Sequence, residues 1–209
     1  MNYISATEHA QYGLDTATPE AWIGAASALI DAHCRRPSLA VTQYTERMRI
    51  DPHRNLAQLT YLPLAPLAPA TSPMVSARAR YSQSQQRRGE PTNELVSDVA
   101  RAFALAGTWI NIDPTLIDFD CATGQVILPM NALTLSYNEI EITYTAGLAA
   151  IPDVVKFACA QIVKNAQATP GLNVKSGRLD RLKIEYFADS LLDESVRKML
   201  APYVAQRMG

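Results

Sequence analysis

Few side chains of the sequence stand at spacings that support catalysis or metal binding. The three histidines, His9, His33 and His53, are far apart, and none has a cysteine or carboxylate at the helical spacing typical of zinc ligands. His33 and Cys34 are adjacent, and neighbouring residues of a helix cannot direct both side chains at one ion. The sequence has no G-x-S-x-G elbow, no phosphate-binding glycine loop and no catalytic-cysteine signature. We therefore expect no enzymatic activity and no cofactor.

Two carboxylates stand one residue apart at Asp118 and Asp120, where one face of a strand could present both to a cation. The residues that follow, 120–124, have the composition of a turn. Such a pair far more often marks a strand that enters a turn, so we expect no metal ion here.

Cysteine usage and hydropathy predict a soluble protein made in a cytoplasm. Cys34, Cys121 and Cys159 are widely spaced and odd in number, which argues against a disulfide framework. No apolar run approaches the roughly 18 residues that a membrane span requires. The first five residues lack the basic-then-apolar layout of a secretory signal. With 48% hydrophobic and 19% charged residues, the 209-residue chain can bury a sizeable core.

Charged residues are segregated into blocks along the chain. Residues 1–34 carry four acids and no base, whereas residues 35–89 carry nine arginines against two acids. Residues 90–160 then carry nine acids against two bases, and residues 161–209 carry eight bases against five acids. Three interpretations remain open. The blocks form a basic face for nucleic acid, or a basic face that meets an acidic face of the next subunit in a ring, or pairs between neighbouring strands of one chain.

The first element that would position these residues is a helix. It opens at Thr18-Pro19-Glu20, with the Thr18 hydroxyl as N-cap, and ends before Pro37. Its apolar positions recur at helical spacing and are mostly small, so that a partner helix can approach closely: Ala21, Trp22, Ala25, Ala26, Leu29 and Ile30.

Strand periodicity dominates the middle of the chain. Short or alternating apolar runs between turn residues predict strands over 43–50, 56–62, 74–81, 108–112, 116–119, 125–128, 138–145 and, further on, 182–187. Repeated prolines make 62–69 an extended connection, because each proline removes a backbone donor. Residues 82–89 are polar and unpatterned, which is typical of a loop, and 93–106 has the spacing of a short helix.

Helical spacing returns over 152–169 and again over 193–208, where Pro202 should kink the helix. The fold class is therefore α+β. Residues 1–37 and 148–209 form a small helical bundle, and 38–147 form an antiparallel β-rich insertion with one short helix.

Three stretches of the sequence resemble one protein family. The first is A-A-S-A-L-I-D at 25–31, followed by a basic pair. The second and most specific is E-I-T-Y-T-A-G at 141–147, followed by I-P-D-V-V-K-F-A at 151–158. The third is the closing L-A-P-Y within 196–203. Together they are similar to the head–tail connector (adaptor) proteins of tailed phages, which dock beneath the portal. Residues 38–135 depart from that pattern, because they are longer and more β-rich than the small helical members.

The resemblance implies a structural role in the virion neck, with the protein made in the bacterial host cytoplasm. Copies of the chain would form a ring, twelve if the family symmetry holds. The ring would dock on the portal protein, extend the channel through which genomic double-stranded DNA passes nonspecifically, and offer a platform to a head-closure or tail-completion protein. Neither a membrane nor a cofactor is implied.

Candidate contact residues follow from the charge pattern and the resemblance. Four residues of the closing helix are candidates for the portal contact: Arg197, Lys198, Tyr203 and Arg207. Eight bases are candidates for contacts with a neighbouring subunit or with DNA in the channel: Arg78, Arg80, Arg87, Arg88, Lys175, Arg178, Arg181 and Lys183. The alternative function is a nucleic-acid-binding accessory protein that uses the arginine-rich block at 35–89. Against it, Tyr81 is the only aromatic near the later arginines, and single-strand binding needs several stacking rings.

Overall fold

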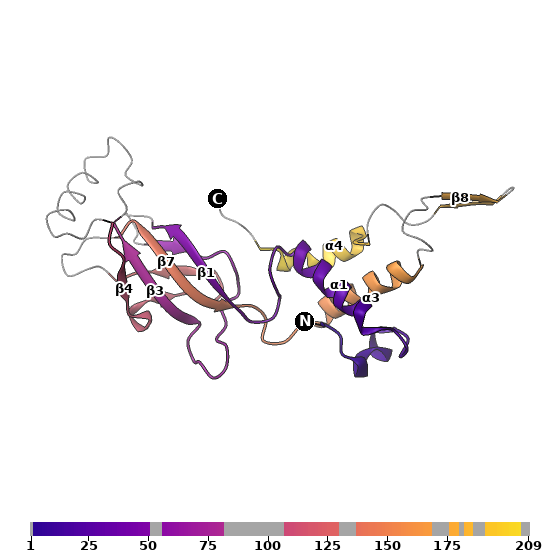
Figure 1. The fold of residues 1–209 in the computed structure, drawn as a ribbon, viewed down its shortest axis with the longest axis horizontal. Helices are drawn as coiled ribbons and strands as arrows, with labels where there is room; N and C mark the ends of the chain where they lie inside the picture. Colours follow the sequence, from indigo (N-terminus) through magenta and orange to yellow (C-terminus); the bar gives the residue numbers. More distant parts are fainter. Residues whose placement is uncertain are drawn as a thin grey trace. The chain divides into compact units, whose positions relative to one another are not determined.

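The computed structural model divides the chain into two compact units and has the predicted α+β architecture (Figure 1). The helical unit comprises Met1–Leu39 and Ala150–Ala205, and the β unit comprises Ala40–Ala149 with Gln206–Gly209. The predicted loop at 82–89 and helix at 93–106 lie outside the described residues. The structure describes residues 2–50, 56–81, 107–129, 137–168 and 191–205, and the backbone alone of 176–179 and 182–185.

The described residues of the helical unit form three helices, and α3 packs against both others (Figure 1). They are α1 (Glu20–His33), α3 (Asp153–Ala168) and α4 (Glu194–Leu200). Each contributes fully buried apolar side chains at helical spacing, and these hold the three together. The largest of them are Ile23, Ile30, Ile162 and Leu200.

The segment before α1 belongs to the same unit. It contains two 3-10 turns, Ala6–Glu8 and Ala10–Tyr12. The Tyr12 hydroxyl donates to Asp153 Oδ1 at 2.7 Å, and its ring meets that of Phe157 edge to face at 5.0 Å between centroids. These contacts fix the segment on the first turns of α3.

Two helix boundaries differ from the prediction. Helix α1 begins at Glu20 with Pro19 in the N-cap position, so Thr18 is not the cap. The Thr18 hydroxyl is instead buried, with no hydrogen-bond partner among the described residues. The last helix was predicted over 193–208 with a kink, but α4 ends at Leu200. The chain continues as a 3-10 turn, Ala201–Tyr203, because Pro202 has no N–H to extend the α-helical ladder.

A two-stranded hairpin lies between α3 and α4 in the sequence. Strand β8 (Ser176–Leu179) pairs antiparallel with β9 (Leu182–Glu185), and Leu179 stands opposite Leu182. Only the second strand was predicted. Strand β8 is short and contains Gly177, so it shows no clear period, and pairing with β9 supplies what the local sequence lacks.

The described strands of the β unit form two antiparallel sheets. The larger has the strand order β1-β7-β3-β4 and the smaller the order β2-β6-β5. The larger contains β1 (Thr42–Arg49), β3 (Met74–Arg80), β4 (Ile110–Ile112) and β7 (Glu139–Ala146). The smaller contains β2 (Leu56–Gln58), β5 (Asp118–Phe119) and β6 (Gln125–Ile127). Strand β7, the most regularly alternating stretch of the sequence, lies in the interior of its sheet.

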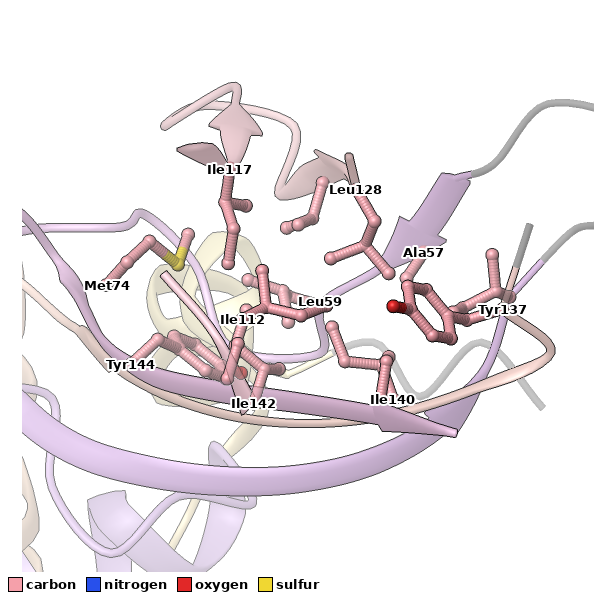
Figure 2. Close-up of a cluster of buried hydrophobic side chains, with 14 of the residues drawn as sticks. Ala57, Leu59, Met74, Ile112, Ile117, Leu128, Tyr137, Ile140, Ile142 and Tyr144 are labelled. Carbon is pink, nitrogen blue, oxygen red and sulfur yellow. The ribbon is translucent and has the colours of Figure 1, made fainter. Parts of the chain in front are cut away.

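The hydrophobic core of the β unit lies between the two sheets (Figure 2). From β7, Ile140, Ile142 and Tyr144 point into it, each at most 1% exposed. From the other side come Val126 of β6 and Leu128. Alternation then directs the intervening residues of β7 and β6 to opposite outer faces of the unit.

The predicted strands were too long in two places. Strand β2 ends at Gln58 and not at residue 62, where prolines begin. Leu116 was predicted to open a strand, but it lies in the 3-10 turn η4 (Pro114–Leu116), and β5 begins at Asp118. Pro114 fixes the first residue of this turn, and the Asp113 side chain caps it by accepting from the Thr115 N–H.

Gly147 ends β7 at a position that only glycine fits. Its φ of +138° is rarely adopted by other residues, and a Cβ here would stand 2.5 Å from the Ala40 carbonyl oxygen. Ala40 also forms a parallel bridge with Leu148. The glycine therefore lets the two ends of the β unit lie side by side.

Candidate protein interfaces

Arginine and glutamate side chains form an ionic row on the outer face of the larger sheet. Glu139 of β7 is only 2% exposed, and each of its carboxylate oxygens accepts from a different arginine. Arg47 Nε of β1 donates to Oε1 at 2.6 Å, and Arg80 Nε of β3 donates to Oε2 at 2.5 Å. Arg78 of β3 pairs with Glu141, its direct neighbour across the strands, at 2.7 Å. The acidic strand thus lies between two basic strands.

The ring of Trp109, which directly precedes β4, lies close to the same three arginines. The guanidinium carbons of Arg80, Arg78 and Arg47 lie 4.5, 5.0 and 5.4 Å from its ring centroid. Arginine above an indole face is stabilised by about 0.5–1 kcal/mol at an exposed site. We call these six residues the Arg–Trp cluster: Arg47, Arg78, Arg80, Trp109, Glu139 and Glu141.

The cluster combines three guanidinium groups with two carboxylates, so it keeps an excess of positive charge. Burial by itself raises the pKa of Glu139, but the hydrogen bonds from Arg47 and Arg80 outweigh it and hold the pKa below its ordinary value. Conversely, the hydrogen bond to Glu139 raises the pKa of Arg47. Both groups are therefore charged at neutral pH.

These ion pairs show that part of the segregated charge is paired between neighbouring strands of one chain. Arg47, Arg78 and Arg80 belong to the basic block, and Glu139 and Glu141 belong to the acidic one. The cluster includes two of the arginines predicted to contact a neighbour or DNA, and of these the Arg80 side chain is 20% exposed and the Arg78 side chain is 46% exposed. Arg78 and Arg47, whose side chain is 52% exposed, are thus the members within reach of a partner.

The structure places the remaining candidates unevenly. Arg178 and Lys183 stand opposite each other in the β8–β9 hairpin, whose side chains are not described. Five candidates lie outside the described residues: Arg87, Arg88, Lys175, Arg181 and Arg207.

The three described portal-contact candidates lie on the exposed side of α4 and on the turn after it. Arg197 and Lys198 are exposed, and Tyr203 is half-buried. Lys198 Nζ lies 2.8 Å from Glu194 Oε1 one turn earlier, and both side chains are about four-fifths exposed, at 77% and 81%. Such a pair contributes only about 0.3–0.5 kcal/mol to folding, so Lys198 remains available to a partner.

An acidic surface on the smaller sheet was not predicted. Asp118 of β5 and Ile127 of β6 stand opposite each other and are exposed, and Leu116 of η4 is 63% exposed. The sequence did contain an indication of this acidic surface, because the stretch 107–129 has three acids and no base. We use the name acidic face for Asp118 and Ile127 together with exposed residues of the turns that precede and follow β5 in the chain, namely Asp113 and Leu116 before it and Asp120 after it.

Two of these carboxylates accept hydrogen bonds from backbone N–H groups of the turns in which they lie. The Asp113 carboxylate accepts from the Thr115 N–H at 2.9 Å, and this bond lowers its pKa. The Asp120 carboxylate accepts from the Ala122 N–H at 2.8 Å, which likewise lowers its pKa. In the part of the chain that the structure describes, no group of three His, Cys, Asp or Glu side chains is placed to hold a metal ion.

The outward face of α1 is apolar. The predicted apolar positions divide between two sides of the helix, with Ala26 and Ile30 buried and Trp22 42% exposed. The helix has only two carboxylates, Glu20 at its start and Asp31 near its end. Between them the outward side is formed by residues with little or no polar surface: Ala21, Trp22, Ala25, Ala28 and Leu29.

The three cysteines are free thiols. Cys34 and Cys159 are buried in the helical unit, and burial raises the pKa of each to about 11. Cys121 is exposed. Among the described residues, no helix is both long enough and apolar enough to cross a membrane.

No protein-family model and no curated protein matches this chain.

Proposed function

We propose that the chain is a structural subunit of a tailed-phage neck. Copies form a ring that docks on the portal, extends the DNA channel and presents a platform for head-closure or tail proteins. The role is mechanical and involves no catalysis. The observation that carries the proposal is the apolar outward face of α1.

A helix that is apolar on all sides is normally buried on all sides. Helix α1 buries Ile23 and Ile30 against its own unit, yet it also presents Trp22 and a row of alanines to solvent. Single exposed apolar residues are ordinary on a monomer, but an uncharged face over three turns is not. Because alanine side chains are small, a helix of a neighbouring copy can approach this face closely.

The resemblance to connector proteins supports the same proposal. Its most specific stretch joins the end of β7 to the start of α3. Gly147 occupies a backbone conformation that favours glycine, and Pro152 accepts from the Val155 N–H at 3.0 Å in the first turn of α3. The motif residues therefore have identifiable roles in the fold at the point where the chain passes from strand to helix.

The proposal is tested by mixing the purified chain with the portal protein encoded in the same genome. We expect a ring of this chain on one face of the portal, visible by electron microscopy and measurable as added mass by sedimentation. Trp22→Glu should abolish that ring, because a buried carboxylate in an apolar contact is strongly unfavourable.

A matched control is Gln167→Glu, which adds the same charge at an exposed position of α3. The control should assemble like the parent, and both variants should melt like it, because neither position is buried. A chain that stays monomeric with the portal, and portal particles that lack it, would overturn the proposal.

A further inference from the structure

We propose that the Arg–Trp cluster of one copy binds the acidic face of a second copy, so that β units meet head to tail. The inference rests on the proposed function, and it names the partner surfaces of the subunit contact. Two observations support it: the Arg–Trp cluster and the acidic face lie on different parts of one unit, and their charges are opposite.

The strand residues of the two surfaces face outward from opposite sheets of the β unit. Ile140 and Ile142 of β7 point into the core between the sheets, so Glu139 and Glu141 face outward from the larger sheet. Val126 of β6 points into the same core from the other side. Ile127 and its partner Asp118 therefore face outward from the smaller sheet.

That placement suits a head-to-tail contact. In such a contact each copy uses two different patches, one for each neighbour, and repeated copies close into a ring when the rotation between them permits. A two-fold contact would require a patch that complements itself. Among the described residues the acidic face carries acids without a base and so cannot complement itself, and the excess of positive charge in the cluster disfavours contact with the same cluster of a second copy.

The charges of the two surfaces are complementary. The described part of the larger sheet's outer face also includes Arg49, which is exposed on β1 and adds to the excess of positive charge. On the acidic face, Asp113 and Asp120 already accept hydrogen bonds from their own turns. Asp118 is exposed, and its side chain has no ion pair with a described residue. We therefore assign Asp118 as the main carboxylate partner of Arg47 and Arg78.

The cluster is ordered before a partner arrives. The Glu139 carboxylate holds Arg47 and Arg80 by ion pairs. The Trp109 ring lies beside the guanidinium groups of these two arginines and of Arg78. Ordered arginines lose less conformational entropy on binding. The side chain of Ile127, which is 47% exposed on the smaller sheet, gives the acidic face an apolar surface that can cover the indole.

DNA fits the cluster less well than a protein carboxylate does. Glu139 and Glu141 lie between the arginines and would repel a continuous row of phosphates. Only one aromatic ring accompanies the arginines in the described cluster, and stacking along a single strand uses several. A discrete carboxylate on a protein surface avoids both difficulties.

A charge exchange tests the contact. Arg47→Glu and Asp118→Arg, each made alone, should weaken self-association of the purified chain at least about tenfold, because each places like charges together. Combined in one chain, the two changes should restore assembly. Mixing the two single variants should also restore it, since every contact between unlike copies then joins opposite charges. Association is measured by analytical ultracentrifugation at low salt, with and without the portal.

The matched control is Gln43→Glu, an exposed position on the same side of β1 as Arg47. It adds negative charge to the basic face without touching the cluster, and it should leave assembly unchanged. Thermal melting of each variant shows whether the β unit still folds. Arg78→Gln, which removes a half-exposed charge without reversing it, provides a milder version of the same test.

The outcomes separate this inference from the proposed function. If the parent forms a ring and the charge-exchange variants assemble like it, the proposed function is supported and this contact is wrong. If the parent forms only open chains or dimers, and the single variants lose them while the double variant regains them, this contact is supported and the ring is wrong. A parent that never self-associates overturns the contact. Salt-sensitive binding of a DNA duplex that Arg47→Glu abolishes, while assembly is unaffected, overturns it in favour of nucleic acid.

Discussion

The helical unit and the β unit present opposite kinds of surface. Helix α1 turns uncharged side chains outward around Trp22, whereas the larger sheet turns outward a row of arginines and glutamates around Trp109. Apolar contacts depend little on salt, and contacts between exposed charges weaken as salt screens them. One chain therefore has two surfaces that can be told apart experimentally by salt alone.

The largest expected effect is on the β unit. Gly147→Val should destabilise it by about 3 kcal/mol or more, because the new side chain meets the Ala40 backbone and the φ of +138° strains it further. The helical unit should keep its own melting transition, measured by differential scanning calorimetry. Gly107→Ala is the control, since Gly107 also has a positive φ but nothing lies within 4 Å of its added Cβ. Equal losses in the two variants would show that crowding at Ala40 is unimportant.

The next effect concerns the ionic row. Glu139→Gln should cost the β unit about 2 kcal/mol, because Arg47 and Arg80 then lose their shared carboxylate on a partly exposed surface. Urea unfolding at neutral pH measures the change. Arg49→Gln, which removes a charge from an exposed neighbouring position, should change stability by less than about 0.5 kcal/mol.

The same carboxylate gives the β unit a pH dependence. The pKa of Glu139 is lower in the folded state than its ordinary value of 4.5. Its contribution is therefore fully present above pH 4.5 and is lost as the pH falls through the lower, folded-state pKa. The stability of Glu139→Gln should change less than that of the parent over this acidic range. Parallel curves for the two proteins would contradict the assignment.

A smaller effect is expected on the helical unit's contact. Trp22→Ala should weaken self-association by about 1–2 kcal/mol while leaving the melting temperature of the monomer nearly unchanged. The loss should be the same at low and high salt, unlike that of Arg47→Glu. Sedimentation at two salt concentrations distinguishes the two surfaces, and equal salt sensitivity would show that they do not act separately.

The smallest effect on folding belongs to α4. Lys198→Ala removes a pair with Glu194 that is exposed on both sides, so stability should fall by no more than about 0.5 kcal/mol. If α4 contacts the portal, binding to the portal should fall by more than stability does. Glu194→Ala, which removes the other member of the pair, is the matched control and should not weaken portal binding.

Local patterns in the sequence were enough to predict the fold class and most elements. Strand β7 was predicted from the alternation of Ile140, Ile142 and Tyr144, which fixes which side faces the core. The end of α4 was overestimated, because apolar spacing continues past Pro202 while the hydrogen-bond ladder does not. Local periodicity therefore locates an element more reliably than it locates its end.

The ionic row could not be placed from the sequence alone. Composition shows that basic and acidic residues are segregated, but it does not show which strands are neighbours. The strand order β1-β7-β3 places the acidic strand between two basic ones, and this order depends on contacts between residues far apart in the chain. The ion pairs of the buried Glu139 follow from the same order, since three strands must come together to place Arg47 and Arg80 on its carboxylate.

The parallel bridge between Ala40 and Leu148 has a consequence for how such a chain could arise. A segment of more than a hundred residues begins and ends at neighbouring points, so it can be spliced into a loop between two helices without stretching that loop. An insertion at this point would leave the ends of α1 and α3 in place. Chains of this architecture are then expected to differ most in length between α1 and α3.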